Sequence, residues 1–219
     1  MTLMKQFPPY RVLIVDDQEM PRQLFETFIE TSEQFRLVAS IRSAEDALAY
    51  AESTDPDLVL MDVCTEGKMS GLEAAKLIKQ AHPRIRIIIV TSMPEYSYLK
   101  RAREAGIDSF WYKEAAKTPL LELMERTMQG ESLYPDQAPE VKLGLAVSTE
   151  FSERELEVLR ELTSGDTNNE IAARLYMSPY TVRDYVQTLL EKTGFRSRTE
   201  LAVRARESGL VIREETEEE

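Results

Sequence analysis

Cysteine is nearly absent from this sequence, since Cys64 is the only one among its 219 residues. An internal disulfide is therefore excluded, and the composition fits a reducing compartment. Long apolar runs are absent too: none approaches the roughly 18 residues of a membrane span, and the first residues lack the apolar segment of a signal peptide. We therefore expect a soluble, cytoplasmic protein with no membrane partner.

Positive charge is also scarce in this chain. Lysine and arginine total 27 against 39 aspartates and glutamates, which gives a formal net charge of −12. Such a balance argues against indiscriminate binding of nucleic acid through bulk charge. It leaves open a basic face on one part of the chain.

The first half of the chain alternates short runs of valine, isoleucine and leucine with segments of helical period. The predicted strands are 11–15, 36–41, 57–61, 85–90 and 109–112. The predicted helices lie near 19–31, 43–53, 71–81, 95–105 and 118–129. Five strand–helix units in succession predict an α/β fold with a five-stranded, parallel, doubly wound sheet. We place this domain at 10–129 and a linker, which could hold one short helical turn, at 130–149.

Reactive residue types follow four of the predicted strands, namely Asp16 and Asp17, Asp62, Thr91, and Lys113. In an open parallel sheet, ligands bind outside the carboxyl ends of the strands, so we expect these side chains to meet there. Carboxylates placed together repel one another unless a cation neutralises them, and magnesium prefers oxygen ligands. The pattern predicts a magnesium and phosphoryl site.

Within that site, Asp17 and Asp62 are the expected direct ligands of Mg²⁺, with the backbone carbonyl of Cys64 as a further ligand. Asp16 would act from behind them or through water. Asp62 can serve as a carboxylate nucleophile that forms an aspartyl phosphate, and Lys113 would bind a phosphate oxygen as a point charge. Taken singly, each residue could have an ordinary structural role instead. Asp16 could be a helix N-cap, Thr91 a β-branched strand end, and Lys113 a solvated loop charge. Their coincidence at successive strand ends favours the phosphoryl site.

The pattern VLIVDD…LVLMD…IIIVTS…FWYK resembles the receiver domain of two-component response regulators, whose sheet is flavodoxin-like. The resemblance implies phosphorylation of Asp62 by a partner sensor histidine kinase. It also implies Thr91, Phe110 and Lys113 as switch residues, with Thr91 pulled inward on phosphorylation and Phe110 rotating into the space behind it. The loop after Asp62 departs from the family, because Thr65–Glu66 stand where a Met-Pro pair is usual. Glu66 could add negative charge near the metal.

From residue 150 onward strand signals are absent and helix starts recur. Three stretches match the Ser/Thr-x-x-Glu capping box, and Ser178 precedes a proline that suits the first helical position. The three boxes are Ser152–Glu155, Thr167–Glu170 and Ser197–Glu200. These signals predict a small all-α domain over 150–212 with four helices at about 152–163, 168–175, 179–193 and 198–208. The acidic tail at 213–219 is expected to be disordered.

The third of these helices carries an apolar stripe at Val182, Val186, Leu189 and Leu190, which is the spacing of one buried helix face. A short helix and a tight turn at 177–179 precede it, so the arrangement predicts a helix-turn-helix with the third helix as the DNA reader. Between residues 174 and 206 there are seven positive and three negative side chains, a local net charge of +4. Without the motif, a helical protein-interaction module would be the default interpretation.

The string FSERELEVLRELTSGDTNNEIAARLYMSPYTVRDYV…LLEKTGFRSRTELA resembles the DNA-binding domain of the NarL/LuxR (FixJ) family. On the exposed face, Arg183 and Gln187 could reach base edges, and Asp184 could accept from cytosine while it repels phosphates. Three matching positions complete the expected DNA-binding set: Thr181, Lys192 and Arg198.

The two resemblances together imply a response regulator of a two-component system rather than an enzyme, since a receiver promotes only its own phosphorylation and dephosphorylation. Phosphorylation of Asp62 would control homodimerisation and sequence-specific DNA binding, and so transcription. Apolar surface left over on the first and fifth helices is the candidate dimer face. Two alternatives remain: a regulator that works without phosphorylation, because its Thr65–Glu66 loop has lost signalling, and an adaptor whose helical domain binds protein.

Overall fold

The computed structural model describes residues 8–113 and 118–211, so the acidic tail predicted at 213–219 lies outside it. The chain forms two compact units, one from Met1–Ser92 and Ser97–Asp136, the other from Met93–Tyr96 and Gln137–Glu219. Across the described ranges, every helix is too short or too polar to cross a bilayer.

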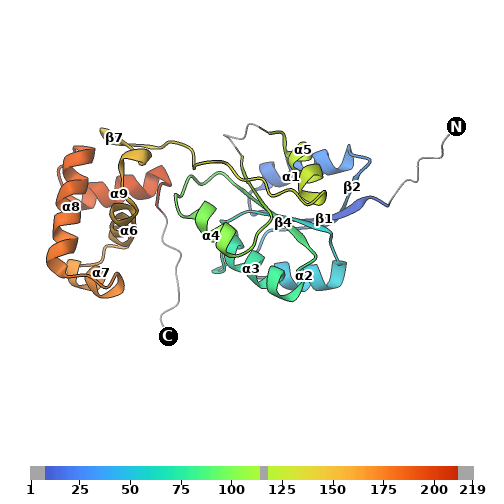
Figure 1. Cartoon of the computed structure of the whole chain (residues 1–219), viewed down its shortest axis with the longest axis horizontal. Coiled ribbons are helices and arrows are strands. Elements are labelled where there is room, and N and C mark those ends of the chain that lie inside the picture. Colours follow the sequence, from blue (N-terminus) through green and yellow to red (C-terminus); the bar gives the residue numbers. More distant parts are fainter. Residues whose placement is uncertain (1–7, 114–117, 212–219) are drawn as a thin grey trace. The chain divides into compact units, whose positions relative to one another are not determined.

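The first unit contains the five-stranded parallel sheet that the sequence predicts, in the order β2-β1-β3-β4-β5 (Figure 1). Its strands are β1 (Tyr10–Val15), β2 (Phe35–Ile41), β3 (Leu58–Met61), β4 (Arg86–Thr91) and β5 (Ser109–Tyr112). The chain runs from β1 out to β2 and then returns to β3 on the other side of β1, so the strand order reverses between β1 and β3. Ligands bind at such a switch point, beside the carboxyl ends of the strands.

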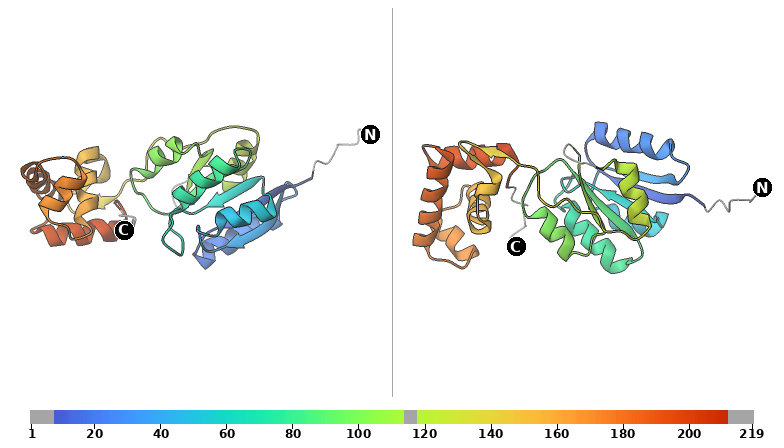
Figure 2. Two further views of the ribbon diagram at one scale, coloured as in Figure 1. Left: turned by 90° about the horizontal axis from the view of Figure 1, so that it is seen from below. Right: turned by 45° about the horizontal axis from the view of Figure 1, so that its top comes forward.

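Helices cover both faces of this sheet (Figures 1 and 2). On one face lie α1 (Glu19–Glu30) and α5 (Leu120–Met128), and on the other α2 (Ala47–Thr54), α3 (Gly71–Ala81) and α4 (Tyr98–Glu104). Helix α2 begins four residues later than the predicted start at 43, and Ser43 forms an isolated bridge with Glu66. The doubly wound architecture is confirmed.

Burial on both faces explains the nearly continuous apolar strands. Successive strand residues point to opposite faces, and one face contributes Val12, Ile14, Leu58, Leu60, Ile88 and Val90 to a single core cluster. Phe25 and Ile29 of α1 and Leu123 and Met124 of α5 belong to the same cluster. Each such buried side chain contributes roughly 1.5–3 kcal/mol to folding, so the sheet holds the strand ends in fixed positions.

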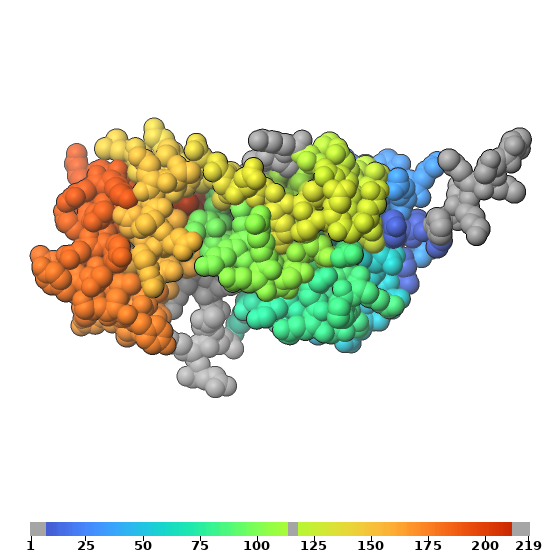
Figure 3. Space-filling view, viewed as in Figure 1, coloured from blue at the N-terminus to red at the C-terminus, as the bar shows by residue number. Residues whose placement is uncertain are grey.

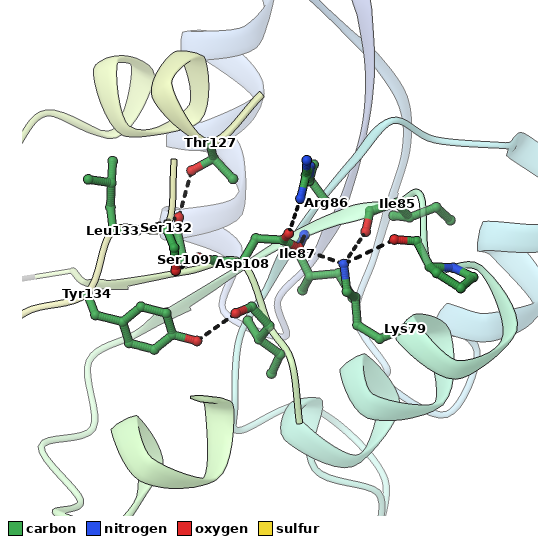
Figure 4. Close-up of polar contacts among 12 residues, drawn as sticks. Lys79, Ile85, Arg86, Ile87, Asp108, Ser109, Thr127, Ser132, Leu133 and Tyr134 are labelled. Carbon is green, nitrogen blue, oxygen red and sulfur yellow. Dashed lines mark hydrogen bonds and ion pairs between the residues drawn. The ribbon is translucent and has the colours of Figure 1, made fainter. Parts of the chain in front are cut away.

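Two polar arrangements fix β5 in this unit (Figure 4). The carboxylate of Asp108, just before β5, accepts from Lys79 Nζ at 2.9 Å, from Arg86 Nη1 at 2.7 Å and from the backbone N–H of Ile87 at 2.8 Å. The segment after α5 follows the free edge of β5, since the Ser132 hydroxyl donates to the Asp108 carbonyl at 2.8 Å. The first residues of the predicted linker therefore belong to the first unit.

The second unit contains the four helices predicted for it: α6 (Glu153–Leu162), α7 (Asn168–Arg174), α8 (Pro179–Thr193) and α9 (Arg198–Ser208). In Figure 3 the gold, orange and red atoms of these helices and of the segment before them form its visible surface. The predicted linker also holds a short hairpin of β6 (Lys142–Leu143) and β7 (Ala146–Val147), followed by the 3₁₀ turn Ser148–Glu150. The sequence analysis missed this hairpin because two-residue strands leave no periodic pattern.

The helix starts of this unit follow the predicted caps with one exception. Ser152 and Thr167 form complete capping boxes, and Ser178 accepts the N–H of Thr181. The box predicted at Ser197–Glu200 is incomplete. Ser197 accepts the N–H of Glu200 at 3.1 Å, but the Glu200 carboxylate accepts from the N–H of Arg196 at 2.9 Å. The backbone N–H of Arg196 also lacks a helical acceptor, and the Glu200 carboxylate accepts its hydrogen bond instead.

Candidate functional site

Three aspartates meet at the switch point of the sheet. Asp16 and Asp17 follow β1, Asp62 follows β3, and one carboxylate oxygen of each lies within 4.8 Å of the others. Asp16 and Asp62 are buried, and Asp17 is half-buried. The structure thus brings together the carboxylates that the sequence predicts as a cation site.

Lys113, directly after β5, enters the same cluster. Its Nζ lies 2.7 Å from Asp16 Oδ2 and 2.6 Å from Asp62 Oδ2, with the side chain almost wholly buried. Burial alone lowers the pKa of the ammonium, but the carboxylates of Asp62 and Asp16 outweigh it and raise the pKa of Lys113 overall. Lys113 therefore stays charged and neutralises one of three negative charges.

Burial and the negative charge that remains at the site both raise the pKa values of the carboxylates. Burial, aided by the charge of Asp16, raises the pKa of Asp62 to about 6, although Lys113 pulls the other way. Burial and Asp16 also raise the pKa of Asp17. Such raised values mean that a further cation would stabilise the site.

The chemistry of the oxygen atoms fits a divalent metal ion. Asp17 Oδ1 is buried without a hydrogen-bond partner among the described residues, so it is available as a ligand. Asp16 has both oxygens engaged, Oδ1 by the N–H of Gln18 at 3.0 Å and Oδ2 by Lys113. It does not cap α1, whose N-cap is Gln18. Asp62 Oδ1 accepts the N–H of Cys64 at 3.3 Å, and the role predicted for the Cys64 carbonyl stays a prediction.

The unusual loop after Asp62 is tied to the segment after β2. Glu66 forms an ion pair with Arg42 at 2.6 Å, and Thr65 Oγ1 accepts the N–H of Ala44 at 3.1 Å. The charge of Glu66, which the sequence analysis placed near the metal, makes the smallest contribution to the raised pKa of Asp17. Arg42 was missed because its partner lies 24 positions along the chain and no local pattern joins them.

The predicted switch residues line the adjacent edge of the site. Thr91 is buried at the end of β4, and its carbonyl accepts the N–H of Lys113 at 2.9 Å. Phe110 is buried as well, and its role as a switch residue stays a prediction. Its ring centroid lies 4.9 Å from that of Tyr112 and 6.2 Å from that of Tyr134. Tyr134, from the segment after α5, is a neighbour that the sequence analysis missed.

In the second unit, four predicted DNA-binding residues lie exposed on α8: Thr181, Arg183, Asp184 and Gln187. The amide of Gln187 donates to Glu191 at 2.8 Å, and the guanidinium of Arg183 lies 6.0 Å from the ring centroid of Tyr180. The apolar stripe faces inward, since Val182, Val186 and Leu189 belong to the core. The polar side of α8 is therefore available to a ligand.

The other two predicted DNA-binding residues are engaged inside the unit. Lys192 Nζ lies 2.8 Å from Glu155 Oε1 and donates to the Glu150 carbonyl at 2.8 Å. Arg198 donates to the Asn168 side chain and to the Asp166 carbonyl, and burial lowers its pKa. The net charge of +4 over residues 174–206 did not include acidic residues from elsewhere in the chain that fold against these residues.

Comparison with known proteins agrees with this geometry. Residues 12–125 match the response regulator receiver domain, and residues 149–205 match the bacterial regulatory proteins of the luxR family. The chain therefore belongs to the response regulators that join a receiver domain to a luxR-type DNA-binding domain, as the sequence analysis predicts.

Particular relatives cover nearly the whole chain. Response regulator protein VraR of Staphylococcus epidermidis is 31% identical over 206 residues, which cover 92% of this chain and 98% of the relative. A LuxR-family two-component response regulator from Aurantimonas is 28% identical over 57% of this chain and 89% of its own, with a TM-score of 0.53. A structure of RcsB dimers bound to DNA is 20% identical over 90% of this chain and 98% of its own, with a TM-score of 0.61. This likeness shows the shared fold.

Proposed function

We propose that Asp62 is the phosphoacceptor of this response regulator, and that its phosphorylation controls pairing of two copies and DNA binding through α8. The observation that supports this most is the environment of the Asp62 carboxylate. It is buried at the switch point, bonded to Lys113, and has a pKa of about 6. Near neutral pH it is therefore mostly ionised, as a nucleophile must be.

The proposed reaction transfers a phosphoryl group from the phosphohistidine of a partner sensor kinase. A carboxylate oxygen of Asp62 attacks phosphorus, a P–O bond forms, the P–N bond breaks, and the imidazole leaves with a proton from solvent. In this structure Lys113 is hydrogen-bonded to two carboxylates, and it would donate one of these hydrogen bonds to a phosphoryl oxygen instead. The buried Thr91 hydroxyl lies at the end of the next strand. Together these two groups would hold the product.

Mg²⁺ would be held by Asp17 and Asp62, with the Cys64 carbonyl as a further ligand and Asp16 behind them. The unpartnered Asp17 Oδ1 supports this arrangement. When bound, the ion supplies neutralisation of the charge that develops on the phosphoryl oxygens.

DNA would be read by the exposed face of α8, with Arg183 and Gln187 at base edges and Asp184 beside cytosine. A single unit makes few phosphate contacts, so pairing of two copies should strengthen and specify binding. Such a regulator would act in the cytoplasm. We place the domain boundaries at 10–136 for the receiver and 137–211 for the DNA-binding unit, because the compact units divide between Asp136 and Gln137 apart from the short segment Met93–Tyr96.

The dimer face proposed for the receiver lies on α1 alone. Met20 is 82% exposed and Leu24 50% exposed, and both line a cavity of about 530 Å³ with Phe25 and Trp111. The fifth helix was also predicted to contribute, but on α5 Leu120, Leu123 and Met124 are buried against the sheet and Leu121 is half-buried. A second copy of the chain would cover the exposed apolar atoms of α1.

Incubation with acetyl phosphate and magnesium tests the phosphoacceptor. We expect the mass of one phosphoryl group on the wild type and none on Asp62→Asn. A wild type that gains no mass would instead favour the phosphorylation-independent alternative. Sedimentation of the phosphorylated chain tests the dimer face: Met20→Asp should stay monomeric, while Leu77→Asp, an exposed position on α3, should pair like the wild type.

The adaptor alternative has its own test. If α8 reads DNA, Arg183→Ala should weaken binding to a DNA duplex and lower its salt dependence. A helical domain that binds only protein would show no such change.

A further inference from the structure

An aromatic side chain stands fully in solvent in the turn of the helix-turn-helix. Tyr176 lies between α7 and α8 and is 96% exposed, more than any other large hydrophobic side chain in the described ranges. Tyr180, in the first turn of α8, is 69% exposed. Burial of Tyr176 therefore adds almost nothing to the stability of the folded state, and burial of Tyr180 adds little.

The backbone at Tyr176 makes its presence costly. Its φ is +53°, and among the described residues Asp55 is the other non-glycine residue with a positive φ. The N–H of Met177 donates to the carbonyl of Ala172 at 3.0 Å, which is the bond of a Schellman motif with Tyr176 at the left-handed position. Glycine is the usual residue there because it lacks a Cβ. Glycine does occupy the position after α8 and α9, at Gly194 and Gly209. A strained, exposed aromatic residue points to a function.

Part of the positive charge around α8 is neutralised by carboxylates of the same unit. Arg183 on α8 has no carboxylate partner among the described residues, whereas three other cations of the unit, Arg174, Arg204 and Lys192, form ion pairs. Arg174 lies 2.7 Å from Glu161, and Arg204 lies 2.9 Å from Glu207, and Lys192 is held as described above. Contacts that need no charge would therefore matter more here than in a basic DNA-binding domain.

The two tyrosines flank the start of the reading face. The Tyr180 ring lies under the guanidinium of Arg183, 6.0 Å from ring centroid to Cζ, so it also orients that side chain. Ser178, which lies between the two tyrosines in the sequence, caps α8. Tyrosine hydroxyls are among the groups that bind phosphate oxygens and set the register of a protein on a duplex.

We propose that Tyr176 and Tyr180 are DNA-positioning residues. Their rings lie against the sugar–phosphate strand beside the groove that α8 enters, and their hydroxyls donate to phosphate oxygens. This rests on the proposed role of α8 as the DNA reader. Because the contacts are neutral, they add affinity without adding salt dependence.

The test measures binding of the full chain to a short duplex of random sequence at several salt concentrations. We expect Tyr176→Gly to weaken binding about tenfold with an unchanged salt slope, and Tyr176→Phe to weaken it by about threefold through the lost hydroxyl. The melting temperature of Tyr176→Gly should be no lower than that of the wild type, since glycine relieves the positive φ. Tyr50→Ala, which removes an exposed tyrosine from α2, is the matched control and should bind like the wild type.

Arg183→Ala distinguishes a failure of the proposed role of α8 from a failure of the role proposed for the tyrosines. If it leaves binding and salt slope unchanged, the proposed role of α8 fails. If it weakens binding but Tyr176→Gly binds like the wild type, the inference about the tyrosines alone is overturned, and the exposed rings serve another partner. A Tyr176→Gly variant that binds weakly and also melts earlier would overturn it too, because the ring would then be structural.

Discussion

The Asp62 carboxylate should make the receiver less stable than its amide equivalent when no cation is bound. Its pKa is about 6 in the folded chain against 3.8 as the ordinary value. Keeping it ionised in the folded site therefore costs about 3 kcal/mol above that pKa. Asp62→Asn removes the charge and keeps an oxygen acceptor for Lys113, so it should recover most of this free energy.

The sign of the pH dependence follows from the raised pKa. Between the two pKa values the folded state holds a proton that the unfolded state has lost, so the wild type loses stability as pH rises through this range. The gain in unfolding free energy from Asp62→Asn should reach nearly its full value at about pH 7.5 and about half of that near pH 5. Added magnesium should reduce it at the higher pH, because the ion neutralises the wild-type cluster.

Urea unfolding in a chelating buffer measures this directly. Trp111, the one tryptophan in the sequence, lies on β5, so its fluorescence reports the first unit alone. Asp46→Asn, a change at an exposed carboxylate before α2, is the matched control and should show no such trend. A gain for Asp62→Asn that is the same at both pH values, or a loss of stability, would refute the reasoning.

Three further substitutions test other parts of the structure. Gly71→Ala places a Cβ 1.8 Å from the Asp62 carbonyl oxygen, so it should cost about 2–3 kcal/mol and slow phosphorylation, measured by Trp fluorescence and mass. Gly144→Ala, whose Cβ would lie 2.1 Å from the Thr193 carbonyl oxygen at a φ of +63°, should cost the second unit a similar amount, seen in the loss of helical circular dichroism. Lys113→Met removes a cation that lowers the pKa of Asp62, so the pH profile of phosphorylation should move to higher pH.

Two glycines with open surroundings serve as controls. Gly106 and Gly165 have a positive φ, as Gly144 does, but a Cβ at either would meet nothing within 4 Å. Their alanine variants should cost only about 1–2 kcal/mol of backbone strain. If they cost as much as Gly71→Ala and Gly144→Ala, the close approaches do not matter. An unshifted pH profile in Lys113→Met would count against the electrostatic account of the site.

The strands and the carboxylate cluster could be predicted because they depend on local patterns. Apolar runs mark strands that are buried on both faces, and β5 runs over the predicted residues. The reactive residues follow directly at the strand ends, and parallel topology then brings Asp16, Asp17 and Asp62 together without further information.

Features that join distant parts of the chain could not be predicted in this way. Tyr134 reaches Phe110 only because the segment after α5 follows the edge of β5. Lys192 and Arg198 looked available for DNA because charges were counted along the sequence, but their partners come from residues 150–168. Likewise, the positive φ of Tyr176 is set by the turn between two helices, and the residue type gives no sign of it.

The most direct test of the central claim is DNA binding with and without a phosphoryl group on Asp62. Duplexes selected by the phosphorylated chain would be titrated in magnesium buffer, with and without acetyl phosphate. We predict that the phosphodonor tightens binding of the wild type and leaves Asp62→Asn unchanged. Equal tightening in both proteins, or none in a wild type shown by mass to be phosphorylated, would contradict the account.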